Sequence, residues 1–123
     1  MKNLILITLL FIGVFSLNAQ NEPIVSWEID QTYDFGLLNQ REAATIKFPF
    51  TNISDEPITF DNVRVSCGCT APSYDFEPIM PDSTGFLEIE FDAVKLGYFY
   101  KKIKVYFSNQ RRAEILWIEG EVE

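Results

Sequence analysis

Hydrophobic and polar side chains alternate with a period of two residues along most of the chain beyond residue 20. Such alternation places one face of an extended strand in a hydrophobic core and the opposite face in water. The pattern is clearest at residues 45–50, 87–91, 102–107 and 116–122. Two further runs, 24–29 and 58–65, bring the prediction to six or seven short strands. No stretch of the sequence shows helical periodicity, so we expect an all-β domain.

Clusters of turn-forming residues separate these runs, at residues 52–57, 78–85 and 108–112. They are rich in Pro, Gly, Asn, Asp and Ser, which favour turns. Short strands joined by frequent turns are typical of a β-sandwich. Pro49 lies inside one predicted strand, and because it has no N–H group we expect it at a sheet edge or a bulge.

The first residues of the chain have the pattern of a secretory signal peptide. Lys2 supplies the positive charge, residues 4–15 are apolar, and Ala19 is a small residue at the expected cleavage point. The apolar run is short for a membrane span. We therefore predict a signal peptide at residues 1–19 and one domain at 20–123. That domain is expected in the periplasm or outside the cell, with no stable membrane anchor after cleavage, in a compartment that permits disulfides.

Charge and composition exclude several functions. The 123 residues include 18 acidic and 10 basic side chains, giving a net charge of −8. Such a chain is a poor ligand for nucleic acid, whose phosphates need Lys and Arg. The sequence has no histidine, so Ser-His-Asp and Cys-His mechanisms are impossible. Carboxylates are scattered, and no spacing singles out a glycosidase pair. We expect no enzyme and no cofactor.

The sequence Cys67-Gly68-Cys69-Thr70 holds the only unusual chemistry, and we select these four residues as a binding or redox site. In a strand, side chains two residues apart share a face. One interpretation is a small-ring disulfide with Gly68 relieving backbone strain. Because the extended spacing lies near the upper limit for bridging, that bond would be strained and readily reduced. It would suit a redox role better than a structural one.

Two other interpretations of the cysteines stay open. Both thiols together are suitable ligands for a soft metal such as Cu(I) or Zn, although a tetrahedral site would need further ligands from a second chain. We assign no metal site on that basis. Alternatively, Cys67 and Cys69 are small buried residues at a strand end that pack without reacting.

For other polar motifs we favour structural roles. Asn52 and Asn109 each end a predicted strand, where they are expected to cap turns. In residues 33–36, Phe35 is expected to pack in the core, Gly36 to allow a turn, and Asp34 to bond nearby backbone. The lysines of the next group are expected on a water-facing strand surface: Lys101, Lys102 and Lys104.

Four segments in this order resemble a family of secreted bacterial domains of unknown function. They are YDFG at 33–36, FPFTN at 48–52, VSCGCT at 65–70, and GYF at 97–99 leading to VYFSN at 105–109. The resemblance covers about residues 27–122, and Cys-Gly-Cys-Thr is its most specific part. It implies an immunoglobulin-like antiparallel β-sandwich of about seven strands, similar to major sperm protein and PapD chaperones. It implies no activity, because a fold does not fix a function.

These observations favour a non-catalytic interaction module of the bacterial cell envelope. An exposed sheet edge would recruit an unidentified envelope protein by strand addition, as pilus chaperones do. The alternative is a thiol redox or soft-metal-handling protein that uses the Cys67/Cys69 pair. A carbohydrate-binding or glycosidase role ranks last, because nothing in the sequence localises such a site.

Overall fold

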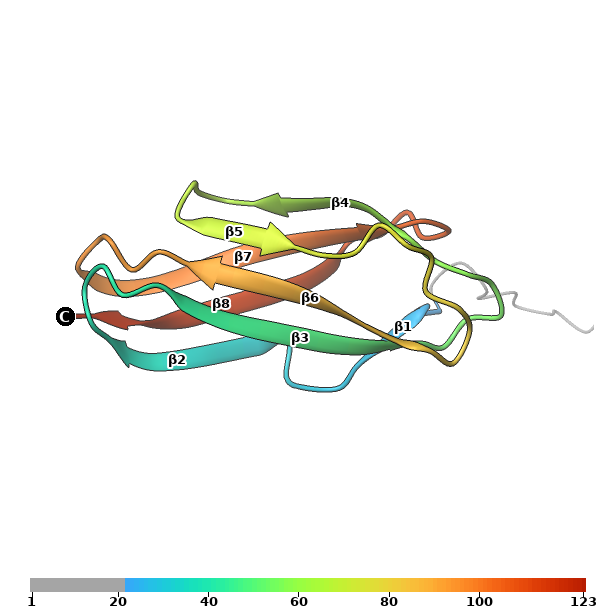
Figure 1. The fold of residues 1–123 in the computed structure, drawn as a ribbon, viewed down its shortest axis with the longest axis horizontal. Helices are drawn as coiled ribbons and strands as arrows, with labels where there is room; N and C mark the ends of the chain where they lie inside the picture. Colours follow the sequence, from blue (N-terminus) through green and yellow to red (C-terminus); the bar gives the residue numbers. More distant parts are fainter. Residues whose placement is uncertain (1–21) are drawn as a thin grey trace, which may run out of the picture.

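The computed structural model describes residues 22–123 (Figure 1). The predicted signal peptide, residues 1–19, lies outside the described residues. Within residues 22–123 no helix has the length and apolarity needed to cross a membrane. The strands are β1 (Val25–Trp27), β2 (Thr32–Leu38), β3 (Ala44–Asn52), β4 (Phe60–Val65), β5 (Thr70–Ser73), β6 (Thr84–Phe91), β7 (Gly97–Phe107) and β8 (Glu114–Val122).

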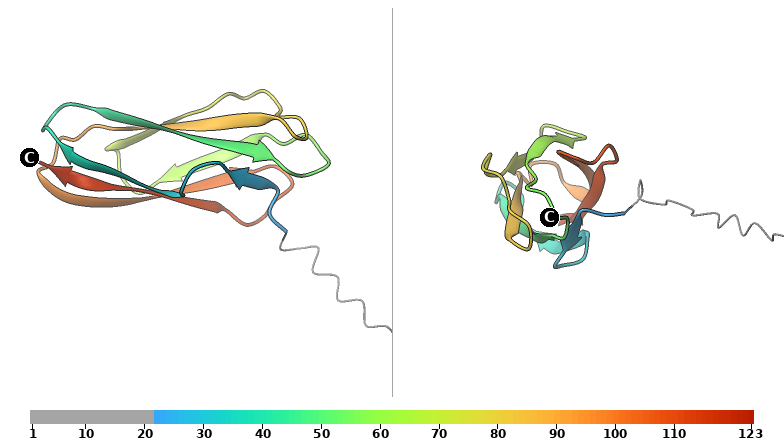
Figure 2. Two further views of the ribbon diagram at one scale, coloured as in Figure 1. Left: turned by 90° about the horizontal axis from the view of Figure 1, so that it is seen from below. Right: turned by 90° about the vertical axis from the view of Figure 1, so that its right-hand side faces the viewer.

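The strands form two four-stranded sheets that pack face to face (Figures 1 and 2). One sheet has the order β1-β3-β6-β5 and the other β2-β8-β7-β4. The predicted all-β sandwich is confirmed, with eight strands where about seven were expected. Neighbouring strands are antiparallel except β2 and β8, which run parallel. The alternation did not predict β2 and β5, since one is irregular and the other has only four residues.

The irregularity of β2 comes from Gly36. The pairing of β2 with β8 shifts between Asp34 and Leu37, and Gly36 has a left-handed φ of 70°. The expected turn at Gly36 is therefore wrong, because the glycine forms a bulge within a strand. The expected backbone bond of Asp34 is confirmed, since its Oδ1 accepts from Gly36 N at 2.7 Å. Phe35 is half-buried and packs against the core.

Pro49 lies inside β3 without interrupting the sheet. The register of β3 with β6 runs unbroken over residues 44–51. The carbonyl of Pro49 accepts from Glu28 N at 2.9 Å, on the β1 side of the strand. Because N–H and C=O of one residue point the same way, the missing N–H also faces β1. The proline thus sits where the β1–β3 ladder ends at Trp27, and no bond to β6 is lost.

The core fills the space between the sheets with aromatic and branched side chains. The ring centroids of Phe50, Phe60 and Phe107 lie 4.9–5.6 Å apart, and Trp27 packs 5.2 Å from Phe50. The three phenylalanines are buried and Trp27 is half-buried. Each buried phenylalanine contributes about 1.5–3 kcal/mol from removal of apolar surface from water. These aromatic contacts join both sheets, since the four residues come from β3, β4, β7 and β1.

Asn52 at the end of β3 is fully buried. Its Nδ2 donates to the carbonyls of Glu56 at 2.8 Å and Ile79 at 2.9 Å, and its Oδ1 accepts from Ser54 N at 2.9 Å. The predicted turn cap is confirmed, and it also ties two loops together. Asn109, in the turn between β7 and β8, has a left-handed φ of 65°, which confirms its predicted place in a turn.

Candidate functional site

The Cys-Gly-Cys-Thr motif lies where the chain passes from one sheet to the other. Residues 66–69 form a tight turn between β4 and β5, and the structure joins Cys67 to Cys69 by a disulfide. Their Cα atoms are 5.3 Å apart, inside the usual disulfide range of about 4.4–6.8 Å. The expected extended spacing is therefore wrong, because the motif lies in a turn and not in a strand. Gly68 is exposed and does not adopt a left-handed φ.

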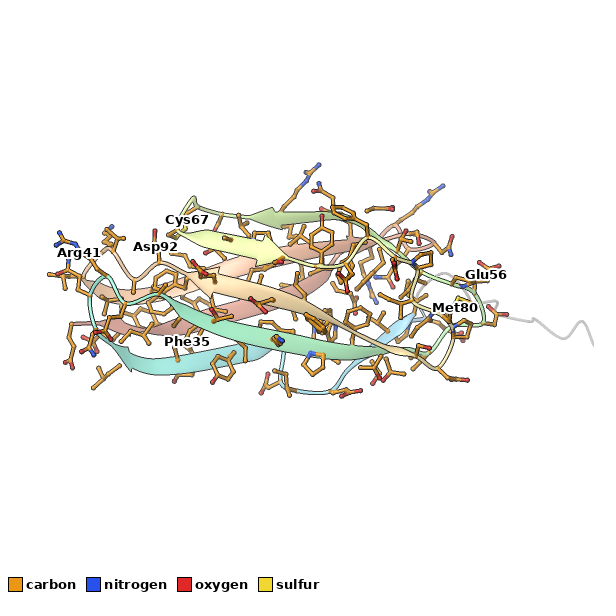
Figure 3. The ribbon with its side chains drawn as sticks, viewed as in Figure 1. Phe35, Arg41, Glu56, Cys67, Met80 and Asp92 are labelled. Carbon is orange, nitrogen blue, oxygen red and sulfur yellow. A yellow bond between two sulfur atoms is a disulfide. The ribbon has the colours of Figure 1, made fainter. Side chains whose placement is uncertain are left out.

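The side chain of Thr70 is buried beneath the turn and contacts both sulfurs of the disulfide. Its Oγ1 lies 3.8 Å from Cys67 Sγ and 3.7 Å from Cys69 Sγ. Because disulfide sulfurs carry no proton, the hydroxyl is the donor, and its single hydrogen is shared between the two sulfurs. The carbonyl of Cys69 accepts from Asp92 N at 3.0 Å, which fixes the turn to the chain leaving β6. Figure 3 shows Cys67 and Asp92 at the same end of the sandwich.

A groove of about 350 Å³ opens beside the disulfide, at the small end of the range for ligand pockets. Phe91 and Phe99 are buried at its base, and their rings stack with centroids 3.9 Å apart. The remaining lining residues are mostly exposed or charged: Cys67, Cys69, Asp92, Lys95, Leu96, Tyr98 and Lys101.

Lys101 is the functional candidate that sequence reasoning missed. On β7 it shares a face with the buried side chains of Phe99 and Ile103. It is half-buried and lines the groove, so its predicted water-facing position is wrong. Lys102 does lie on the outer face, with its Nζ 5.4 Å from the ring of Trp117. The signal was present in the sequence, because Lys101 is in phase with the hydrophobic positions of its own strand.

The strand that carries Lys101 has an unpaired edge at the groove. Strand β4 pairs with β7 only as far as Val65 opposite Ile103. Among the described strands, none pairs with residues 97–102 on that side, and we call these residues the β7 notch. In an antiparallel strand, alternate residues turn both N–H and C=O to the same side. The β7 notch therefore presents free backbone donors and acceptors next to the groove.

The true edge strands have features that discourage pairing. β5 has only four residues and contains Pro72, β2 is bulged at Gly36, and β1 has three residues. β4 exposes the charged side chains of Asp61 and Arg64. Short, bulged, charged or proline-containing edges resist the addition of another strand. The β7 notch has no proline, and its register with β8 is unbroken. Its two charged residues, Lys101 and Lys102, are both positive, so they oppose a second copy of the same edge and favour an acidic segment.

Metal binding receives no support from the part of the chain that the structure describes. Within residues 22–123, no three His, Cys, Asp or Glu side chains gather closely enough to hold a metal ion. Cys67 and Cys69 are bonded to each other, so neither sulfur is a thiolate ligand in this state. The groove thus combines four features: a disulfide, an apolar base, lysines at its rim and free backbone groups.

Comparison with solved structures supports the fold. A Porphyromonas gingivalis W83 protein of unknown function has a TM-score of 0.67 at 16% identity, covering 86% of this chain and 50% of that one. The ASH/PapD-like domain 7 of human CEP192 has a TM-score of 0.69 at 8% identity, with 83% and 89% covered. The Caenorhabditis elegans major-sperm-protein family member WR4 has a TM-score of 0.57 at 9% identity, with 83% and 100% covered. These likenesses show the PapD-like and major-sperm-protein-like sandwich.

Comparison of the sequence adds a family but no function. This chain spans half the length of the Porphyromonas gingivalis protein. No curated protein matches the chain. Residues 25–122 match the model of a family described as "Protein of unknown function (DUF1573)". That range contains both the disulfide turn and the β7 notch.

Proposed function

The chain belongs to the DUF1573 family of proteins of unknown function, and from its surface we propose that it is a non-catalytic protein-interaction module. It binds an extended segment of a partner by strand addition at the β7 notch. The observation that carries this proposal is the free edge of residues 97–102 beside an apolar-based groove. In strand addition, main-chain hydrogen bonds give affinity and pockets for alternate side chains give specificity.

The groove also defines the chemistry of the segment. Its base is Phe91 and Phe99, which favour an apolar side chain. Lys95 and Lys101 outnumber Asp92 among its charged lining residues, although the whole chain carries −8. The expected ligand is therefore an extended segment with an apolar residue close to a carboxylate. Lys101 also discourages pairing with a second copy of the same edge, because two lysines would meet.

We place this interaction in the cell envelope or outside the cell, after removal of residues 1–19. The signal-like pattern at the start of the chain and a disulfide that needs an oxidising compartment both support that location. The partner is then another envelope protein. Neither nucleic acid nor a membrane surface fits the net negative charge.

Photo-crosslinking in the bacterial host tests the proposal. A photoreactive amino acid replaces Leu96, which lines the groove and is 58% exposed. The matched control is Met80, which is 54% exposed at the opposite end of the sandwich (Figure 3). We expect a discrete adduct from position 96 and none from position 80. Equal adducts from both positions, or none from position 96, would contradict the proposal.

A charge reversal sharpens the same experiment. Lys101→Glu places a carboxylate where the segment is expected to carry its own, so the yield of the position-96 adduct should fall at least severalfold. Lys104→Glu is the control, since Lys104 lies on the same strand with its side chain exposed on the outer face. Equal yields from both variants would show that Lys101 does not contact the segment.

A further inference from the structure

The Cys67–Cys69 disulfide faces the groove instead of being sealed in the core. Both cysteines are half-buried and both line the groove. The bond encloses only Gly68, and so short a loop restricts the unfolded chain very little. The turn is already held by the Asp92 N–H bond to the Cys69 carbonyl. Stabilisation of the fold therefore does not explain why the disulfide is present or why it is accessible from the groove.

We propose that this disulfide exchanges with cysteine thiols carried by the segment bound at the β7 notch, and thereby oxidises them. The inference rests on the proposed function for delivery of the thiol, since strand addition would run the segment past both sulfurs. The ligand class becomes an extended protein segment with two cysteines. Exchange happens once per disulfide, so the chain acts as a stoichiometric oxidant and not as an enzyme.

The exchange balances in two steps. A thiolate of the partner attacks one sulfur of the disulfide, the S–S bond breaks, and the other sulfur leaves as a thiolate. The second thiol of the partner, as its thiolate, then attacks the partner's sulfur in the mixed disulfide and releases the remaining cysteine. Cys67 and Cys69 end as two thiols after taking up two electrons and two protons. The partner loses the same and gains a disulfide.

The groove contains the groups that this chemistry needs. A departing thiolate is stabilised by nearby cations and hydrogen-bond donors. Thr70 Oγ1 lies within 3.8 Å of both sulfurs and donates to whichever leaves. Lys101 and Lys95 line the same groove as cations, and Asp92 is the opposing charge there. Lys101 is a positioning residue in this scheme, because it acts on the sulfur through charge.

Trapping of the mixed disulfide tests the exchange in the cell. Cys67→Ser and Cys69→Ser each leave one thiol, and each is produced in cells that also contain the parent protein, which supplies the oxidised partner. The lone thiolate attacks the partner's disulfide, the reverse of the second exchange step, and the mixed disulfide should accumulate because no neighbouring cysteine can release it. After acid quenching and alkylation, we expect an adduct that disappears on reduction, in at least one single variant. The double variant Cys67→Ser/Cys69→Ser is the control and should give none. Absence of an adduct from both single variants would overturn the exchange.

Reduction kinetics test the same chemistry without the partner. Dithiothreitol serves as the dithiol, and free thiols are counted with time on the purified oxidised protein. Lys101→Met should slow reduction about fivefold, the effect expected for removing one nearby charge. Lys101→Arg keeps the charge, so its reduction rate should lie within about twofold of that of the parent. The reduction rate of Lys104→Met should equal that of the parent. Equal rates for all four proteins would remove Lys101 from the proposal. A disulfide that resists dithiothreitol in the folded protein would overturn the exchange.

The photo-crosslink from position 96 separates this inference from the binding proposal. If the cysteine-free double variant still crosslinks while the single variants trap nothing, binding stands and exchange is wrong. If trapping succeeds while position 96 gives no crosslink, exchange stands and the partner does not lie at the β7 notch. Loss of both signals would overturn both proposals.

Discussion

The two ends of the sandwich are built differently. At one end, which we call the closed end, the loops after β3, β5 and β7 are tied together through buried Asn52 and the backbone bond from Ser108 N to Thr59 O at 2.9 Å. At the other, the open end, β4 leaves its sheet early and creates the β7 notch beside the disulfide turn. Figure 3 shows Glu56 and Met80 at the closed end and Cys67 and Asp92 at the open end.

This difference separates stability from binding within one small domain. The aromatic contacts of Phe50, Phe60 and Phe107 lie toward the closed end and join both sheets. Both ends expose apolar side chains, Met80 at the closed end and Leu96 and Tyr98 at the open end, but at the open end they lie beside the unpaired backbone groups of the β7 notch. Exposed apolar surface beside an open edge adds little to folding but is available to a partner. Substitutions at the two ends should therefore have different consequences.

The largest loss of stability is expected at the closed end from Phe50→Ala. Phe50 is fully buried and contacts Trp27, Phe60 and Phe107, so its removal leaves a cavity and should lower the free energy of unfolding by about 4 kcal/mol. Chemical denaturation measures the loss. Phe86→Ala is the control, since Phe86 is 43% exposed, and it should cost under about 1 kcal/mol. A similar cost for both would contradict the assigned core.

Asn52→Ala should follow, with a loss of about 3 kcal/mol. The alanine would leave the N–H of Ser54 without its acceptor and would remove one of the two donors from each of the carbonyls of Glu56 and Ile79. Asn62→Ala, on an exposed strand position, should change stability by less than about 0.5 kcal/mol. If denaturation curves of the two variants overlap, Asn52 does not hold the closed end together.

Gly120→Ala tests how the open end is packed. A Cβ at Gly120 would lie 2.8 Å from the carbonyl oxygen of Gly36 and 2.8 Å from Phe99 Cζ. We expect a loss of about 2 kcal/mol from overpacking, together with a shift of Phe99 at the base of the groove. Gly68→Ala is the control, because a Cβ there meets nothing within 4 Å. Equal melting temperatures for the two variants would contradict this packing.

Removal of the disulfide should matter little for folding. The double variant Cys67→Ser/Cys69→Ser closes no loop, and the three-residue loop of the parent contributes about 1.5 kcal/mol or less. Its free energy of unfolding should lie within about 1.5 kcal/mol of that of the oxidised parent. A loss comparable to that of Phe50→Ala would make the bond a structural staple and argue against its role in exchange.

The smallest expected effect concerns ionisation of Tyr98. The pKa of Tyr98 is raised above its ordinary value because its phenol donates to Glu119 Oε2 at 2.9 Å, with smaller contributions from desolvation and nearby charges. The bond favours the protonated phenol, so it stabilises the fold below the ordinary tyrosine pKa and is lost as pH rises through the raised one. Glu119→Gln should lower the pKa of Tyr98 in an ultraviolet titration. Tyr98→Phe identifies its transition, and an unchanged titration would contradict the bond.

Local pattern predicted the fold but only part of the site. Alternation identified the long strands because each has one face in the core. It did not predict β2, whose alternation is broken by the bulge at Gly36, or β5, which is short and contains Pro72. The motif directed attention to Cys67 and Cys69, yet their turn depends on where β4 stops pairing with β7. That stop is a tertiary feature with no local signal. The inward position of Lys101 was predictable, because it alternates in step with Phe99 and Ile103 along β7. The cluster of Lys101 with Lys102 and Lys104 instead suggested a solvent-exposed surface.

Residue-resolved amide hydrogen exchange of β7 in the free protein tests the central claim most directly. If the β7 notch is open, alternate amides of residues 97–102 should exchange at least about tenfold faster than the amides of residues 103–107 that donate to β4. The other amides of the notch, which donate to β8, should remain protected. Equal protection of the amides on both hydrogen-bonding edges of β7 would mean that another segment already pairs with the β7 notch. There would then be no place for a partner strand beside the disulfide.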